Sequence, residues 1–285
     1  MTLLPRPAVP GDLAAITALQ DRYDTHWLGA PERDESEMAE ELSHASECIV
    51  VDDGGEMIAA TWITGLSTSL TIAPGADVPS TLDVLLPWLT SRRGTVAVLD
   101  RDDDLRRAFL DAGWLHDRSA FELLRPVTPD LHLDEPRWPD DVRVTDFSAA
   151  TPEQVHELIY VDARWADVIG HVERTVPDWV SNFVTDKDPP DQQVLAWRDG
   201  RLVGAATGRI FADGSGWVAQ LAVARSERRR GLGRALLLEA FRRRVAAGAT
   251  TLGLGVQAEN AGAIALYTGI GLIIDREWQI FAPPS

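Results

Sequence analysis

A proline-rich, polar stretch interrupts the chain near its middle, and the segments on either side repeat one order of predicted elements. The stretch spans residues 126–141. Its prolines are Pro126, Pro129, Pro136 and Pro139. Proline lacks a backbone N–H and restricts the residue before it, so a linker is predicted here. Because 285 residues suffice for two domains, the predicted domains are 1–125 and 142–285.

Each half is predicted to fold as a mixed sheet with helices on both faces. Each opens with a helical pattern, at 12–23 and 152–165. Each continues with two apolar runs around an Asp-Gly turn, at 48–64 and 194–210, which is a strong hairpin signal. The later predicted elements are strands at 95–99 and 251–256 and helices at 80–91, 105–112, 232–247 and 261–269. Strands and helices in this order indicate an α/β architecture of two tandem domains.

The segment 217–238 carries the most specific chemical pattern in the chain. An apolar strand, 217–223, runs into a loop rich in arginine and glycine, which opens onto a helix. A helix N-terminus presents unpaired N–H groups and the positive end of the helix dipole. Gly231 and Gly233 let the backbone approach an anion closely. The loop therefore favours a pyrophosphate, although it has neither the P-loop pattern nor the complete Rossmann glycine pattern.

Two blocks of the second half resemble the signatures of the GNAT superfamily of acyl-CoA-dependent acyltransferases. Arg228-Arg-Arg-Gly231-Leu-Gly233 matches the family's Arg/Gln-x-x-Gly-x-Gly/Ala block, which grips the pyrophosphate of acyl-CoA. Residues 260–272 resemble the family's Asn-x-x-Ala-x-x-Leu-Tyr-x-x-x-Gly block. The resemblance covers roughly 142–282, and it implies two GNAT-like domains with the working cofactor site in the second.

The resemblance also implies a role for each matching residue. Backbone groups of Leu221, Ala222 and Val223 would bind the pantetheine arm, as an edge strand binds a peptide-like partner. Tyr267 would be the general acid, because an ordinary phenol stays protonated at neutral pH and can donate to the leaving thiolate. Further cofactor contacts are expected from Arg228, Arg229, Arg230, Gly231, Leu232, Gly233, Arg234, Asn260 and Ala263.

The position of the family's usual catalytic glutamate holds Trp217, which cannot accept a proton. Gln220 is nearby but is no base. The general base is therefore unassigned, and the candidates are Asp213, His171, Glu173 and Glu259. The family also tolerates an absent base when the amine arrives neutral.

The first half departs further from the family pattern. Phe109 stands opposite Tyr267, Asp102 opposite Asn260, and Asp77 lies where a phosphate would bind. A carboxylate repels phosphate, so this half is expected to have kept the fold and lost the cofactor site. The arrangement resembles tandem-GNAT proteins of the mycothiol synthase type in architecture.

An aromatic segment at 160–183 is the expected acceptor side. Its aromatic residues are Tyr160, Trp165, His171, Trp179 and Phe183. Its carboxylates are Asp162, Asp167 and Glu173. Such a set suits a cationic or partly apolar small molecule. Packing of the same aromatics between helices and sheet is an equally good interpretation.

The composition of the chain indicates which partners it is expected to bind and in which compartment it is expected to work. A net charge of −17 disfavours binding to nucleic acid or to anionic membranes. No apolar run is long enough for a membrane span, and a single cysteine, Cys48, fits a cytoplasmic protein. The absence of a Cys/His cluster predicts no metal site, and Cys48 is not expected to carry an acyl group.

The leading functional hypothesis is an N-acyltransferase that moves an acyl group from acetyl-CoA or another acyl-CoA to the amine of a small molecule. Two alternatives stay open. One is a non-catalytic acyl-CoA-binding or regulatory protein. The other is a GNAT-fold enzyme with different acyl-CoA chemistry, such as decarboxylation or thioester hydrolysis. The oligomeric state is not specified by the sequence.

Overall fold

The computed structural model describes residues 3–64, 67–92, 94–167, 173–184 and 189–284. The chain divides into two compact units. The first comprises Met1–Phe121 together with Arg276–Ser285, and the second comprises Glu122–Asp275. Among the helices of the described ranges, none combines the length and apolar character that a membrane crossing needs.

The first unit is a sheet of seven strands with helices. Its strand order is β1-β2-β3-β4-β5-β12-β6. Its elements are β1 Leu4–Pro7, α1 Leu13–Leu28, α2 Glu35–Ser43, β2 Glu47–Asp53, β3 Glu56–Thr64, β4 Ser67–Ile72, α3 Val78–Arg92, β5 Thr95–Leu99, α4 Asp103–Asp111, β6 Leu115–Pro126 and β12 Ile273–Ala282. The predicted Asp-Gly hairpin is β2–β3, whose register runs from Glu47 opposite Ile63 to Asp53 opposite Glu56.

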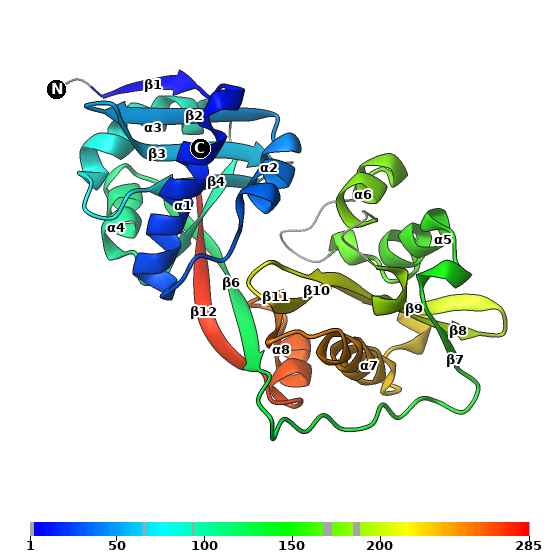
Figure 1. Ribbon diagram of the computed structural model, residues 1–285. Coiled ribbons are helices and arrows are strands. Elements are labelled where there is room, and N and C mark those ends of the chain that lie inside the picture. The colour runs from blue at the N-terminus through cyan, green and yellow to red at the C-terminus, as the bar shows by residue number, and fades with distance from the viewer. Residues whose placement is uncertain (1–2, 65–66, 93, 168–172, 185–188, 285) are drawn as a thin grey trace. The chain divides into compact units, whose positions relative to one another are not determined.

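The second unit repeats the pattern with the strand order β6-β11-β10-β9-β8-β7. Its remaining elements are β7 Arg143–Thr145, α5 Pro152–Glu157, α6 Val176–Phe183, β8 Val194–Arg198, β9 Arg201–Ile210, β10 Ser215–Val223, α7 Leu232–Ala246, β11 Thr251–Gln257 and α8 Ala261–Thr268. Helices α5 and α6 cover one face of strands β8–β10, and α7 covers the other (Figure 1). The expected layering of mixed sheet and helices is confirmed for this unit.

The predicted helix at 152–165 differs from the observed one. Helix α5 ends at Glu157 and continues as a π-helical turn, Leu158–Asp162. The inward-facing residues Leu158, Ile159 and Tyr160 of this turn are consecutive in the sequence and all buried. Because apolar periodicity does not distinguish a π-helical turn from an α-helix, the sequence predicts an ordinary helix over this run.

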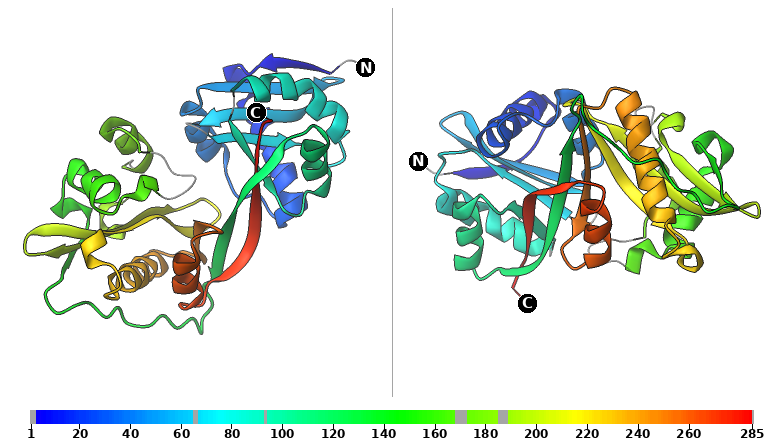
Figure 2. Two further views of the ribbon diagram at one scale, coloured as in Figure 1. Left: turned by 180° about the vertical axis from the view of Figure 1, so that it is seen from behind. Right: turned by 90° about the horizontal axis from the view of Figure 1, so that it is seen from below.

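The last strand lies in the sheet of the first unit, although the predicted boundary assigns it to the second domain. Residues 278–281 of β12 pair antiparallel with β5, so that Trp278 is opposite Leu99 and Phe281 opposite Val96. Figure 2 shows β12, in red, beside β6. Phe281 is 1% exposed and stacks on Phe109 with ring centroids 5.5 Å apart. The C-terminal segment thus completes the core of the first unit.

The predicted linker also belongs to the second unit. It has no helix or strand between β6 and β7, as its prolines indicate. Two of its carboxylates nevertheless pair with arginines of α7. Asp134 lies 2.8 Å from Arg234, and Glu135 lies 2.8 Å from Arg242. The segment is therefore anchored along α7.

Candidate cofactor cleft

Strands β10 and β11 run in parallel and separate partway along their length. They pair only over Ser215–Trp217 and Thr251–Gly253. Beyond these pairs, residues from Val218 and Leu254 onward line a cavity of about 530 Å³. Strand β10 keeps β9 as its neighbour on the other side up to Val223. The cavity therefore has as one wall a strand edge that is not paired with β11, which suits a peptide-like arm.

Most of the predicted cofactor-binding residues line this one cavity. They are Leu221, Ala222, Val223, Arg228, Arg229, Gly231, Gly233, Arg234, Asn260 and Ala263, and the predicted acid, Tyr267, joins them. Two predicted residues do not line it. Leu232 is 2% exposed and packs in the core, and Arg230 is exposed and lies 3.3 Å from Glu227.

Several lining residues were not predicted. They come from the separated parts of both strands, from α8 and from the beginning of the acceptor segment. They are Ala163, Trp165, Val218, Ala219, Leu254, Gly255, Val256, Gln257, Gly262 and Leu266. From the sequence, Trp165 was predicted only as an aromatic residue of the acceptor side. The parallel strand 251–256 was predicted, but its separation from β10 is a tertiary feature without a local sequence signal.

The loop before α7 is shaped for an anion. Arg229 and Gly231 both have left-handed backbone conformations, with φ of 62° and 83°. Gly231 is the N-cap of α7 and supplies no side chain to cap the helix. The first N–H groups of α7 therefore face the cleft without a side-chain acceptor at the cap. At Gly233 an added Cβ would meet its nearest neighbours only at 3.7 Å and 3.8 Å. This geometry fits the pyrophosphate of acyl-CoA.

Arg228, the first residue of the signature, is exposed and donates side-chain hydrogen bonds to two backbone carbonyls of the protein. Its Nε donates to the carbonyl of Val223 at 3.2 Å, and its Nη2 donates to the carbonyl of Ala163. Partial burial, together with the nearby positive charge of Arg225, lowers the pKa of Arg228. The side chain thus ties the acceptor segment to the end of β10.

Asn260 and Tyr267 both lie on α8. The Asn260 side chain caps the helix, since its Oδ1 accepts from the N–H of Ala263 at 3.2 Å. Tyr267 is 8% exposed, and this burial raises the pKa of its hydroxyl to about 12. The hydroxyl is therefore protonated at neutral pH, as a proton donor must be.

Of the proton acceptors proposed from the sequence, the three that the structure describes, Asp213, Glu173 and Glu259, do not line the cleft. Asp213 accepts hydrogen bonds from the N–H and hydroxyl of Ser215, in the turn before β10. Glu173 and Glu259 are exposed and lie outside the cavity wall. His171 lies outside the described residues. Within the described ranges the cavity wall contains arginines but no carboxylate or histidine, and no group of three or more His, Cys, Asp or Glu could hold a metal ion.

The aromatic acceptor segment divides between cleft and core. Trp165 lines the cleft. Tyr160 and Trp179 are 6% and 0% exposed, and the ring of His156 lies 4.7 Å from that of Tyr160. Burial raises the pKa of Tyr160. Trp179 donates its Nε1 proton to Gln220 at 2.9 Å. Core packing is therefore what the structure shows for Tyr160 and Trp179.

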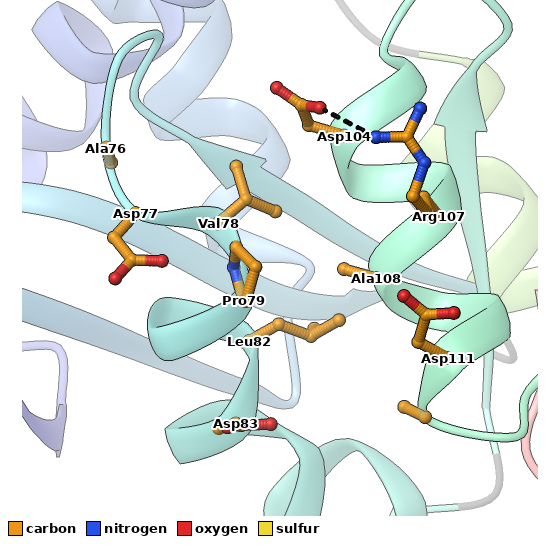
Figure 3. A pocket seen from close by; sticks show the side chains of 11 residues that line it. Ala76, Asp77, Val78, Pro79, Leu82, Asp83, Asp104, Arg107, Ala108 and Asp111 are labelled. Atoms are coloured by element: carbon orange, nitrogen blue, oxygen red, sulfur yellow. Dashed lines mark ion pairs between the residues drawn. The ribbon is translucent and has the colours of Figure 1, made fainter.

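The first unit has a cavity of about 410 Å³ between α3 and α4. Its lining is mainly acidic, whereas the charged residues that line the cleft of the second unit are arginines. Four carboxylates line it, from Asp77, Asp83, Asp104 and Asp111, with Arg107 placed 3.5 Å from Asp104 (Figure 3). Asp77 accepts from the N–H and hydroxyl of Ser80 at the start of α3, which lowers the pKa of Asp77. An anionic side chain thus occupies the helix start at which a phosphate would have to bind.

Comparisons with known proteins point to one superfamily. The sequence profile described as the Acetyltransferase (GNAT) family matches residues 146–272. The mycothiol acetyltransferase of Streptomyces coelicolor is 30% identical over 167 residues, which are 55% of this chain and 50% of that protein. The corresponding enzyme of Streptomyces avermitilis is 31% identical over 165 residues. The chain therefore spans about half the length of these curated relatives.

Solved structures share the fold over nearly the whole chain. A GCN5-related N-acetyltransferase from Sphaerobacter thermophilus superposes with a TM-score of 0.81 at 21% identity, over 98% of this chain and 95% of that one. A tandem GNAT protein from the clavulanic acid biosynthesis pathway gives 0.76 at 15% identity, over 99% of both chains. With the cleft and its signature residues in the second unit, residues 146–272 belong to the GNAT acetyltransferase family, and the chain as a whole shares the fold of a tandem GNAT protein.

Proposed function

We propose that the chain is an acyl-CoA-dependent N-acyltransferase that works in the cleft of the second unit. The observation that carries the proposal is the meeting of three features in one cavity. These are the open edge of β10, the anion-binding start of α7 and the buried, protonated Tyr267. Together they fit the pantetheine, the pyrophosphate and the thioester sulfur of acyl-CoA.

The proposed reaction is direct transfer in a ternary complex. The acceptor nitrogen attacks the thioester carbon, the C–S bond breaks, and the Tyr267 hydroxyl gives its proton to the departing sulfur. Water returns a proton to Tyr267, which balances the proton that the acceptor nitrogen loses. The arginines of the cleft wall disfavour a cationic amine beside them, so the acceptor is expected to enter as the neutral amine and to release its proton to water. Holding both reactants in one site supplies a large part of the rate.

The relatives' names suggest the acceptor class. Both curated relatives are mycothiol acetyltransferases, so we extend the proposal to acetyl-CoA as donor and a small-molecule amine as acceptor. Ala163 and Trp165 line the cleft from the acceptor segment, and they are the expected contacts of that amine.

Calorimetry with CoA and a thiol-release assay with acetyl-CoA and a panel of small primary amines test the proposal. We expect one CoA per chain and thiol release that depends on the amine. CoA binding without release would favour a non-catalytic acyl-CoA-binding protein. Release that does not depend on an amine would favour thioester hydrolysis.

A further inference from the structure

Strand β10 contains a bulge at the place where it leaves β11. Its register with β9 pairs Val218 with Gly208 and then Gln220 with Thr207, so Ala219 is the additional residue. Val218 and Ala219 both line the cleft. A bulge re-aims the backbone and side chains that follow it. This one therefore sets which groups of β10 face the cavity.

A buried arginine holds one side of the bulge. Arg244 on α7 is 0% exposed, and its Nε donates to the carbonyl of Trp217 at 3.1 Å. Its Nη1 donates to the carbonyl of Ala240 at 3.0 Å. Gly216 makes room for this side chain, because an added Cβ there would lie 3.0 Å from the Cβ of Arg244. Trp217 is the last β10 residue that pairs with β11.

A buried glutamine holds the other side. Gln193 is 3% exposed. Its Nε2 donates to the carbonyl of Gly208, and its Oε1 accepts from the N–H of Gly208, both at 2.9 Å. Only glycine fits at position 208, since φ is 150° and an added Cβ would lie 2.0 Å from the Trp217 carbonyl oxygen. The two side chains thus supply hydrogen bonds to buried backbone groups beside the bulge.

We propose that Arg244 and Gln193 are positioning residues, which fix the bulge and thereby the open edge of β10 from Val218 to Val223 that receives acyl-CoA. This inference rests on the proposed function. Without Arg244, the part-buried Trp217 carbonyl loses a partner, and β10 gains by sliding back into a regular ladder with β9. Because strand side chains alternate, a slip of one residue exchanges the groups that face the cavity. The start of α7, which is built separately, keeps its geometry.

The binding of two probe molecules separates the contribution of the β10 edge from that of the α7 start. Acetyl-CoA uses both the strand edge and the helix start, whereas 3′-phosphoadenosine 5′-diphosphate, the nucleotide part of CoA, uses only the helix start. We expect Arg244→Met to weaken acetyl-CoA binding about tenfold or more, the effect of one lost buried hydrogen bond. Nucleotide affinity is expected to stay within about twofold.

Arg244→Lys, which keeps the charge, should recover part of the difference. Arg242→Met is the matched control on the same helix, because its partners are Glu135 and the Leu133 carbonyl.

The outcomes separate the inference from the proposed function. Equal losses for both probes would make Arg244 a general support of the fold, and unchanged affinities would show that the bulge does not depend on it; either result overturns the inference. A wild-type chain that binds neither probe would overturn the proposed function and this inference with it. If Arg244→Met does not fold, as circular dichroism would show, Gln193→Met is expected to give the same selective loss.

Discussion

At the scale of single residues, Tyr267 is the central residue of the proposed site. The sequence motif predicts that a tyrosine stands there, and the tertiary structure sets how far its side chain is buried. The motif at 260–272 predicts a tyrosine near the thioester. The structure adds that the side chain is 8% exposed and lines the cavity. Burial disfavours the phenolate and raises the pKa to about 12. The residue is therefore suited to donate a proton, and its first-unit counterpart, the buried Phe109, has none to give.

Tyr267→Phe is expected to keep the fold and the affinity for CoA while slowing amine-dependent thiol release by about 10²-fold, as is typical when a general acid is lost. Calorimetry with CoA and the thiol-release rate at saturating acetyl-CoA measure the two effects. Unchanged turnover would mean that the thiolate leaves unaided or takes its proton from another group.

At the scale of elements, two glycines at the start of α7 serve different purposes. Gly231 has φ of 83°, a conformation that other residues adopt at a cost of about 1 kcal/mol. Gly233 lies inside the first turn, and a methyl group there would make only ordinary contacts. Backbone conformation therefore favours the first glycine, whereas packing does not require the second, whose place we attribute to the proposed approach of an anion.

Gly233→Glu should abolish CoA binding, because it adds bulk and negative charge where the pyrophosphate is expected. Gly233→Ala is the matched control and should fold normally, with a smaller loss of affinity. Calorimetry with CoA and a thermal melt of both variants measure the difference. Binding by the glutamate variant at wild-type strength would place the cofactor elsewhere.

At the scale of the whole molecule, the position of the C-terminal strand and the burial of the tyrosines both result from contacts between several elements. Phe281 lies far along the chain from residues 1–121, which form the rest of the first unit, yet it packs in that unit's core with Phe109 and Trp114. All three tyrosines, Tyr23, Tyr160 and Tyr267, have pKa values raised mainly by burial.

Phe281→Ala is expected to destabilise the first unit by about 3–5 kcal/mol, the usual effect of removing a buried phenylalanine. CoA affinity of the second unit should change by less than about twofold. Hydrogen exchange on peptides from each unit measures the effect, and Phe241→Ala on α7, where the side chain is 0% exposed, is the converse control. Faster exchange confined to the second unit would contradict the assignment of β12.

Raised tyrosine pKa values predict a loss of stability at high pH. In the unfolded chain tyrosine titrates near pH 10, whereas folded Tyr267 titrates near 12. The contribution is therefore complete below about pH 10 and is lost as the pH rises from 10 to 12. At pH 10 the native chain should show much less tyrosinate absorbance at 295 nm than the chain in urea. Coincident titration curves would contradict this expectation.

The sequence by itself determined the order of elements and the residue types at the start of α7. Asp-Gly turns, helical periodicity and the Arg/Gly loop are local patterns, so β2–β3, β8–β9 and the start of α7 follow from a few neighbouring residues. The signature also predicted most of the cleft wall, from Leu221 to Tyr267. Only the tertiary structure decided that β10 leaves β11 after Trp217, that Arg228 ties the acceptor segment to the end of β10 and that β12 joins the first unit. Each of these depends on which distant partner satisfies a buried backbone group or covers an apolar side chain. Arg244 is such a partner, and no pattern around it in the sequence specifies the Trp217 carbonyl it binds.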